Sequence, residues 1–275
     1  MKNILTLAIM FVIATNINGQ KPGDKLIYDS HACEGIPYAT VKVLGKMMGI
    51  CANDKGWFHV THQNSDSLLV SCVGYQTVIV KAERDTIFLT PSVISIGEVT
   101  VKPHKIKEYD FGYAYLKRGL CPLPCLGDEN KINFTEIVSQ INITPPMDYY
   151  KIKGVKMKVE NASGKPIARL HIYKPDNNGV PGIELLPKDI IINTSIKNNY
   201  IDLSYLDIYS NAPILFVGFE FIITDKKECK YRENRISFWY TESIKQSCNY
   251  ARAYYGTNNY KWIKFDNFVT TQVCY

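Results

Sequence analysis

Short runs in which apolar and polar residues alternate, separated by turn sequences, follow one another along most of this 275-residue chain. Alternation with a period of two is typical of a β-strand with one buried face. It predicts strands in the first part of the chain at 25–30, 38–44, 57–62, 67–73, 75–81, 86–89 and 98–102. In the run 38–44, Ala39, Val41 and Val43 lie on the face that we expect to be buried. Strands this short, at nearly regular intervals, indicate an antiparallel sandwich.

The strongest turn signal in this region is Asn53-Asp54-Lys55-Gly56. Asn and Asp side chains can bond the nearby backbone, and glycine tolerates positive φ. We therefore expect the chain to reverse its direction between two strands at this point.

The same pattern continues in the second part of the chain, after a looser stretch. We interpret 103–149 as a connector with a first strand, because 134–141 suits either a helix or a strand. Further strands are predicted at 155–159, 168–173, 190–193, 200–203 and 214–221, with a loop at 176–182. The run 214–221 is apolar on both faces, which is typical of a central strand.

Several turn and strand positions in the first part agree, in order, with a known family. They are Gly35-Ile36-Pro37, Ala39 to Val43, Gly49, Asn53 to Phe58, Asp66 to Leu68 and Ser71 to Tyr75. Over roughly residues 24–102 the chain resembles the carboxypeptidase regulatory-like domain. The resemblance implies a transthyretin-like β-sandwich that accompanies a catalytic domain in metallocarboxypeptidases and quite different partners elsewhere. The strand at Ile96 to Val101 resembles the one that closes this module in TonB-dependent transporters, but the remaining chain is too short for a plug and a barrel.

The second part resembles another known domain over residues 152–222, with RLHIY, then DNNGVPG, then LFVGFEF. It is similar to the jelly-roll-like domain that follows regulatory-like modules in exported bacterial proteins, and this resemblance implies no site. We therefore expect an all-β chain: a signal peptide at 1–19, a transthyretin-like β-sandwich at 20–102, the connector and first strand at 103–149, and a jelly-roll-like β-sandwich at 150–275.

The N-terminus predicts export. Lys2 precedes an apolar run of eleven residues, Ile4 to Ala14, and small or polar residues follow up to Gln20. Such a run is too short to span a bilayer, which needs about 20 residues, but it suits a signal peptide. We expect a protein of the periplasm, the outer-membrane surface or the extracellular space, with no transmembrane segment after cleavage.

Charge and cysteine content refine this expectation. Loss of residues 1–19 removes Lys2 and no acid, so the net charge falls from +6 to +5, and the scattered basic residues argue against nucleic acid as a partner. Eight cysteines in an exported chain predict disulfides, and the candidate pairs are Cys229–Cys248, which flank a hairpin-like segment, and Cys121–Cys125, which can close a small loop. Cys72, within an apolar run, is expected to be a buried free thiol. Paired CxxC motifs with suitable His partners are missing, so we expect no zinc site.

The sequence offers few candidates for catalysis. His31 and Glu34 have the spacing of the His-x-x-Glu zinc pair of metallocarboxypeptidases, and His171 is a conceivable third ligand, but the pair falls in a predicted turn and His171 in another predicted domain. A Gly-x-Ser-x-Gly elbow and the glycine-rich nucleotide motifs are missing. The loop from Asp176 to Asn178 can supply oxygen ligands to calcium or simply turn the chain.

Aromatic residues are concentrated near the C-terminus. Tyr254, Tyr255, Tyr260 and Trp262 flank the predicted turn 256–259 and are our candidate ligand-binding residues. Tyr and Trp combine apolar area with a polar edge, so exposed rings here can stack on sugars or bind a protein partner. The alternative is that these rings fill a sandwich core.

We therefore expect a non-enzymatic exported protein of the cell envelope with a binding or structural role and no cofactor, whose partner is a glycan or an envelope protein. A carbohydrate-binding module that uses the C-terminal aromatics is one alternative, favoured by an exposed aromatic shelf. A hydrolase with an unrecognised site is another, favoured by titratable residues that converge in one pocket of the second domain.

Overall fold

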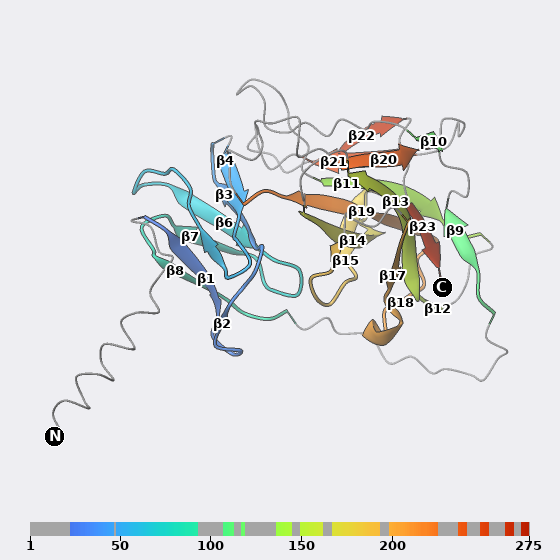
Figure 1. Ribbon diagram of the computed structural model, residues 1–275, viewed down its shortest axis with the longest axis horizontal. Coiled ribbons are helices and arrows are strands. Elements are labelled where there is room, and N and C mark those ends of the chain that lie inside the picture. Colours follow the sequence, from blue (N-terminus) through green and yellow to red (C-terminus); the bar gives the residue numbers. More distant parts are fainter. Residues whose placement is uncertain are drawn as a thin grey trace, which may run out of the picture.

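The computed structural model describes residues 23–46, 48–92, 107–112, 117–118, 136–144, 149–161, 167–192, 198–224, 236–240, 248–252, 262–266 and 271–274. Over these residues the chain is all-β, with antiparallel sheets and one short 3-10 helix, η1 (Ser204–Leu206), which confirms the predicted fold class. We call residues 23–92 the N-terminal half and residues 107–274 the C-terminal half. The two halves lie side by side (Figure 1). The predicted signal peptide and the strand 98–102 lie outside the described residues.

Two four-stranded sheets form the N-terminal half. One contains β2 (Glu34–Gly35), β1 (Lys25–Asp29) and β5 (Trp57–Phe58) in this order, with β8 (Thr86–Leu89) also paired to β1. The other has the order β4 (Met48–Cys51), β3 (Thr40–Val43), β6 (Ser67–Ser71) and β7 (Val78–Lys81). Apolar side chains between the sheets form one buried cluster. The sequence predicted an antiparallel sandwich, but β8 pairs with β1 in parallel, so the prediction is wrong for this pair of strands.

The predicted turn at Asn53 to Gly56 is confirmed. Asn53 Oδ1 accepts hydrogen bonds from the backbone N–H groups of Lys55 at 2.9 Å and Trp57 at 3.0 Å. Gly56 has φ +83°, and a Cβ atom there would lie 2.7 Å from the carbonyl oxygen of Ile27. Only glycine combines this backbone conformation with so close an approach to β1. The strand that follows is shorter than predicted and ends at Phe58.

The strands of the C-terminal half are longer. They are β9 (Asp110–Gly112), β10 (Lys117–Arg118), β11 (Glu136–Asn142), β12 (Tyr150–Lys151), β13 (Gly154–Asn161), β14 (Ile167–Pro175), β15 (Pro181–Glu184), β16 (Ile191–Ile192), β17 (Asn198–Asp202), β18 (Tyr209–Ser210), β19 (Ile214–Ile222), β20 (Ile236–Tyr240), β21 (Cys248–Arg252), β22 (Ile263–Asp266) and β23 (Thr271–Cys274). Residues 134–141, which suit either a helix or a strand, lie mostly in the strand β11.

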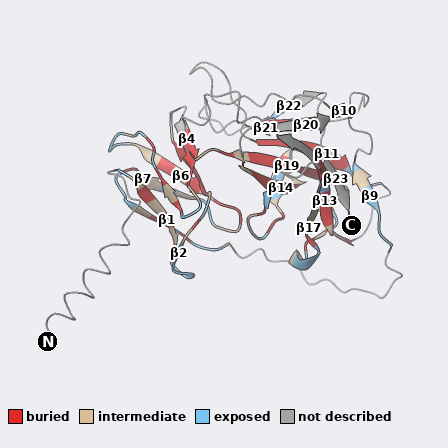
Figure 2. Ribbon diagram, in the orientation of Figure 1, coloured by how far each residue is buried: buried red, intermediate tan, exposed pale blue. Residues whose placement is uncertain are grey.

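A seven-stranded sheet dominates this half. Its order is β15-β14-β19-β11-β21-β22, with β16 also paired to β14. A six-stranded sheet built around β13 and β23 accompanies it, and β12 pairs with β18. Figure 2 shows that buried residues are concentrated on β11, β14 and β19. β19 is buried on both faces over most of its length, so the prediction of a central strand is confirmed.

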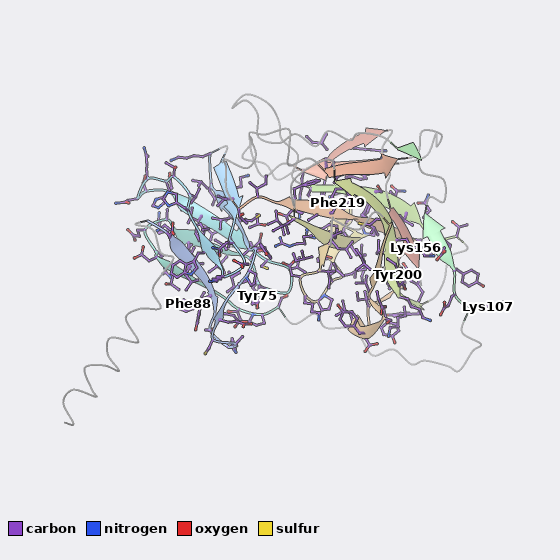
Figure 3. The ribbon with its side chains drawn as sticks, in the orientation of Figure 1. Tyr75, Phe88, Lys107, Lys156, Tyr200 and Phe219 are labelled. Carbon is purple, nitrogen blue, oxygen red and sulfur yellow. The ribbon has the colours of Figure 1, made fainter. Side chains whose placement is uncertain are left out.

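The largest core cluster of the described residues joins apolar residues of the seven-stranded sheet with Val155 and Met157 of β13 and with Val73 of the N-terminal half. Phe219 of β19 is 1% exposed and lies within the C-terminal half, whereas Phe88 of β8 is 56% exposed and lies on the N-terminal half (Figure 3).

No helix among the described residues has the length and the apolar composition that crossing a membrane requires.

The expectation of a single buried face on β3 is wrong. All four residues of β3 are buried, including Thr40 and Lys42, which lie on the face away from the N-terminal core. The reason is that the C-terminal half packs against this sheet: Thr40 donates a hydrogen bond to Glu220 at 2.9 Å, and the N–H of Cys51 on β4 donates to the carbonyl of Ile223 at 2.7 Å. Alternation cannot show that a second body covers the polar face.

Candidate functional site

Alternate residues of β14 point to opposite faces of the seven-stranded sheet. Ala168, Leu170 and Ile172 belong to the main core cluster. The residues between them, Arg169, His171 and Tyr173, share the other face because side chains in a strand repeat with a period of two. A nine-residue strand therefore combines an apolar face with a row of three polar side chains.

The strand register extends this polar face across the sheet. Arg169 on β14 lies opposite Glu220 on β19, Glu220 lies opposite Glu136 on β11, and Glu136 lies opposite Arg252 on β21. Four neighbouring strands thus place two cations at the ends of a row and two carboxylates between them. Side chains that lie directly opposite on adjacent strands are close enough to interact.

Arg169 links the two halves of the molecule. Its Nη1 donates to Glu220 Oε2 at 2.7 Å and to Thr40 Oγ1 at 3.3 Å, and its Nη2 donates to the carbonyl of Tyr38 at 2.5 Å. Its Nε lies 2.5 Å from Asp189 Oδ1 in an ion pair that is not aligned as a hydrogen bond. Arg169 is 1% exposed, and burial without these partners would be costly.

His171 lies between two carboxylates. Its Nδ1 is 2.6 Å from Glu184 Oε2, and its Nε2 is 3.2 Å from Glu220 Oε2. Because a carboxylate only accepts hydrogen bonds, this arrangement requires a proton on both ring nitrogens. Tyr173 stacks on the His171 ring with 5.4 Å between centroids and an interplanar angle of 9°. We therefore assign His171 as an imidazolium ion.

Tyr173 connects His171 to the far end of the charged row. Its hydroxyl donates to Glu136 Oε1 at 2.7 Å and accepts from Arg252 Nη2 at 3.0 Å. Arg252 Nε also donates to Glu136 Oε2 at 2.5 Å. The guanidinium of Arg252 lies 4.6 Å from the ring centroid of Trp262, a cation–π contact.

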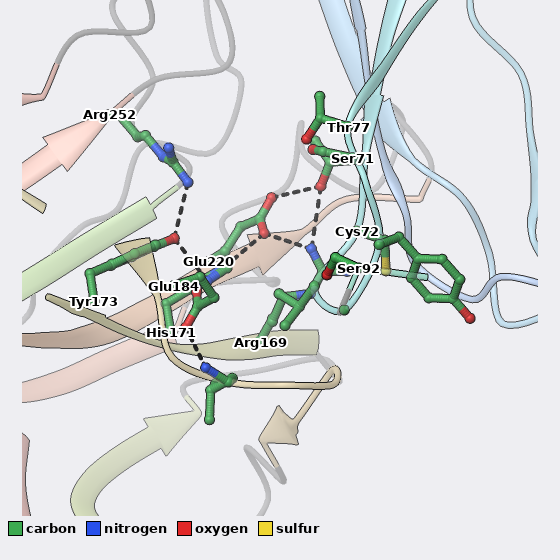
Figure 4. A pocket seen from close by; sticks show the side chains of 15 residues that line it. Ser71, Cys72, Thr77, Ser92, Arg169, His171, Tyr173, Glu184, Glu220 and Arg252 are labelled. Atoms are coloured by element: carbon green, nitrogen blue, oxygen red, sulfur yellow. Dashed lines mark hydrogen bonds and ion pairs between the residues drawn. The ribbon is translucent and has the colours of Figure 1, made fainter. Parts of the chain in front are cut away.

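These residues form one wall of a pocket of about 240 Å³ between the two halves. Arg169, His171, Tyr173, Glu184, Glu220 and Arg252 come from the C-terminal half, and Thr40, Ser71, Cys72, Tyr75, Thr77 and Ser92 come from the N-terminal half. In Figure 4, Ser71, Thr77 and Ser92 lie across the pocket from His171 and Tyr173. The site therefore exists only where the two halves meet.

Ion pairs and burial together set the protonation states of the titratable side chains in this pocket. Burial disfavours the charged form of His171, but Glu136 and Glu184 outweigh it and raise the pKa of His171 to about 10. Burial favours the neutral form of Glu220, but Arg169 and His171 outweigh it and lower the pKa of that carboxyl. Burial raises the pKa of the Cys72 thiol to about 12. None of these three groups changes its charge near neutral pH.

This ionisation decides what the pocket can do chemically. A general acid or base works best when its pKa lies near the working pH, and a cysteine nucleophile must be a thiolate. His171, Glu220 and Cys72 meet neither condition. In these protonation states His171, Glu220 and Cys72 offer a ligand hydrogen-bonding groups, and their pKa values are far from those of a general acid, a general base or a thiolate at neutral pH.

Of the four candidate ligand-binding residues, only Trp262 belongs to the described part of the chain. Tyr254, Tyr255 and Tyr260 lie outside the described residues. Trp262 is half-buried and packs against the small cluster around Tyr173, with 5.8 Å between the two ring centroids and an interplanar angle of 70°. Its contact with Arg252 places Trp262 behind one wall of the pocket.

The other candidates are separated from one another. His31 is exposed and Glu34 lies in β2, whereas His171 belongs to the buried network of β14. Among the described residues, no group of three or more His, Cys, Asp or Glu is placed to hold a metal ion. Asp176 Oδ1 accepts from the backbone N–H groups of Asn178 at 2.8 Å and Val180 at 3.1 Å, so this carboxylate turns the chain.

The cysteines were predicted with mixed success. Cys72 is a buried free thiol, as predicted, and Cys33 and Cys51 are also free. Cys121, Cys125 and Cys229 and the side chain of Cys248 lie outside the described part, so both predicted disulfides stay predictions.

Arg169, Glu220, Glu136 and Arg252 were not predicted from the sequence as a group. A signal for part of this group was present, because Arg169, His171 and Tyr173 recur at every second position of a strand and Glu220 interrupts an apolar run. The sequence of a single strand does not specify the register that brings the four strands together.

Comparison with known proteins gives no assignment for this site. No protein-family model matches the chain, and a search of curated proteins found no match.

Proposed function

We propose that this chain is a non-enzymatic, exported protein of the cell envelope and that the pocket between its halves binds a small polar ligand. The observation that carries the proposal is that the cations Arg169 and His171 are paired with the carboxylates Glu220 and Glu184, while the opposite wall presents hydroxyl groups. A pocket with a few converging polar groups is the usual form of a ligand site. Export is inferred from the charge and apolar run at residues 1–19.

The hydrolase alternative has one observation in its favour, because titratable residues do converge in a pocket. The ion pairs among these titratable residues argue against a hydrolase. Hydrolysis by this wall would need His171 to lose its proton or Glu220 to gain one near neutral pH, and their pKa values are shifted away from that range in both cases. The convergence is better explained by the junction of the two halves, which Arg169 ties to Tyr38 and Thr40.

The proposal is tested by blocking the pocket. Thr77 is exposed and lines the pocket, so Thr77→Trp fills its mouth without cutting the buried network. Thr61 is equally exposed but does not line the pocket, so Thr61→Trp is the matched control. In ligand-observed NMR with a library of small polar compounds, we expect binding by the wild type and Thr61→Trp and its loss in Thr77→Trp.

Two results would overturn the proposal. One is a library in which no compound binds the wild type, or in which every binder is unaffected by Thr77→Trp. The other is turnover of chromogenic esters, glycosides, phosphates or peptides that is abolished by His171→Gln, which would establish the hydrolase alternative.

A further inference from the structure

The two walls of the pocket differ in chemistry. The hydroxyls of Ser71, Thr77 and Ser92 on the N-terminal wall have no protein partner among the described residues. Each hydroxyl can donate one hydrogen bond and accept two. Across the pocket stand the paired charges of Glu184, Glu220 and their cations. A ligand therefore meets groups that both donate and accept on one side and the Glu184 carboxylate on the other, because Glu184 is 22% exposed whereas Glu220 is buried.

The paired charges select against an ionic ligand. An anion would compete with Glu220 for Arg169 and His171, and a cation would compete with His171 for Glu184 and Glu220. In either case a buried group would lose its partner, and an uncompensated buried charge is strongly unfavourable. A neutral molecule leaves every ion pair intact.

The size of the pocket limits the ligand further. At about 30 Å³ for each water molecule, 240 Å³ corresponds to about eight waters. That is the space of one six-membered ring with its hydroxyl groups. A longer chain must extend out of the mouth beside Thr77, which is exposed.

One residue of the N-terminal wall is held in a fixed position. The hydroxyl of Tyr75 donates to Asp29 Oδ2 of β1 at 2.8 Å, so this side chain is anchored to the N-terminal half.

We infer that the pocket binds a neutral polyhydroxylated ring, a single unit of a carbohydrate, between the hydroxyls of the N-terminal half and the paired charges of the C-terminal half. This inference rests on the proposed function and names its ligand class. It differs from the alternative in the sequence analysis, because Tyr254, Tyr255 and Tyr260 take no part.

The test uses the full-length exported protein with three kinds of probe. Titration calorimetry and ligand-observed NMR are carried out with neutral monosaccharides (glucose, galactose, mannose and N-acetylglucosamine), with anions (acetate and inorganic phosphate), and with ethanolamine as a cation. The double variant Thr77→Val/Ser92→Ala removes two hydroxyls that have no protein partner in the described part of the chain, so we expect it to fold like the wild type. Thr61→Val/Ser65→Ala is the matched control, since both residues are exposed and lie outside the pocket.

We expect at least one monosaccharide to bind, and the affinity to fall about fivefold or more in Thr77→Val/Ser92→Ala and stay unchanged in the control. Binding of an anion or ethanolamine without any monosaccharide would overturn this inference and leave the proposed binding function in place. If no probe binds and the polar library is also silent, both are overturned. Sugar binding that is equal in the two double variants places the sugar elsewhere and overturns the inference alone.

Discussion

Arg169 of β14 and Glu220 of β19 lie opposite each other in the strand register, their side chains form an ion pair of 2.7 Å, and Thr40 of the N-terminal half donates a hydrogen bond to Glu220. Each of the two is 1% exposed. The pair belongs at once to the seven-stranded sheet and to the junction of the halves. Its loss should therefore affect both the stability of the chain and the shape of the pocket.

The first prediction concerns this ion pair. Arg169→Met should lower the free energy of unfolding by about 3–5 kcal/mol, because it leaves Glu220 buried without its main cation. Urea unfolding followed by tryptophan fluorescence measures the change. Arg84→Met is the control, since Arg84 is exposed. A loss below about 1 kcal/mol would contradict the central role of Arg169.

A companion variant separates charge from packing. Arg169→Met/Glu220→Leu replaces the pair by apolar side chains of similar volume, and such replacements are often neutral or stabilising. We expect the double variant to regain most of the stability lost by Arg169→Met. If it does not, the hydrogen bonds from Arg169 to Tyr38 and Thr40 carry the stability instead of the ion pair.

The second prediction concerns pH. The pKa of His171 is raised from 6.5 to about 10 by Glu136 and Glu184, which outweigh burial. Between these values the folded chain holds a proton that the unfolded chain has released, so the stabilisation is complete below about pH 6.5 and disappears as the pH rises towards 10. Thermal unfolding from pH 6 to pH 10 should show a falling stability in the wild type.

His171→Gln removes this titration and should flatten that fall, at the cost of lower stability at pH 6. His31→Gln is the control, because His31 is exposed and lies outside the network. Parallel pH profiles for the wild type and His171→Gln would show that His171 is neutral in the folded chain, contrary to its contacts with two carboxylates.

The sequence was sufficient to predict the strands but not the site. Alternation predicted β1, β3, β6, β7 and β8 of the N-terminal half to within a few residues but missed β2 and β4, and the apolar run 214–221 predicted the central β19. These are local signals, set by side-chain periodicity and backbone preference. The row from Arg169 to Arg252 depends on the register of four strands whose paired residues Glu136 and Arg252 are 116 residues apart in the chain.

The burial of two polar residues on β3 could not be predicted from the sequence either. Thr40 and Lys42 have the spacing of an exposed strand face, yet both are buried, and Thr40 lies against Glu220 of the C-terminal half. Contact between the two halves has no periodic signature in either segment, so a site formed by both could not be located from one segment alone.

The third prediction concerns the free thiols. Burial raises the pKa of both Cys51 and Cys72 to about 12, so neither is a thiolate at neutral pH, whereas Cys33 is exposed. Brief treatment of the native protein with iodoacetamide should label Cys33 and spare Cys51 and Cys72, as read by peptide mass spectrometry. Unfolding in urea should expose all three. Rapid labelling of Cys72 in Cys33→Ser without urea would show instead that the pocket opens and admits the reagent.

The fourth prediction decides between two roles of Trp262, as a ligand-binding ring or as part of the core. Trp262 packs against Tyr173 and lies over Arg252, so Trp262→Ala should lower the free energy of unfolding by about 1–3 kcal/mol through loss of buried area and the cation–π contact. Trp262→Phe should recover about half of this loss, because a ring is kept. Tyr205→Ala, at a residue 59% exposed, is the control. If Trp262→Ala is as stable as the wild type and abolishes sugar binding, Trp262 is a ligand-binding residue and the aromatic C-terminal region becomes the better site.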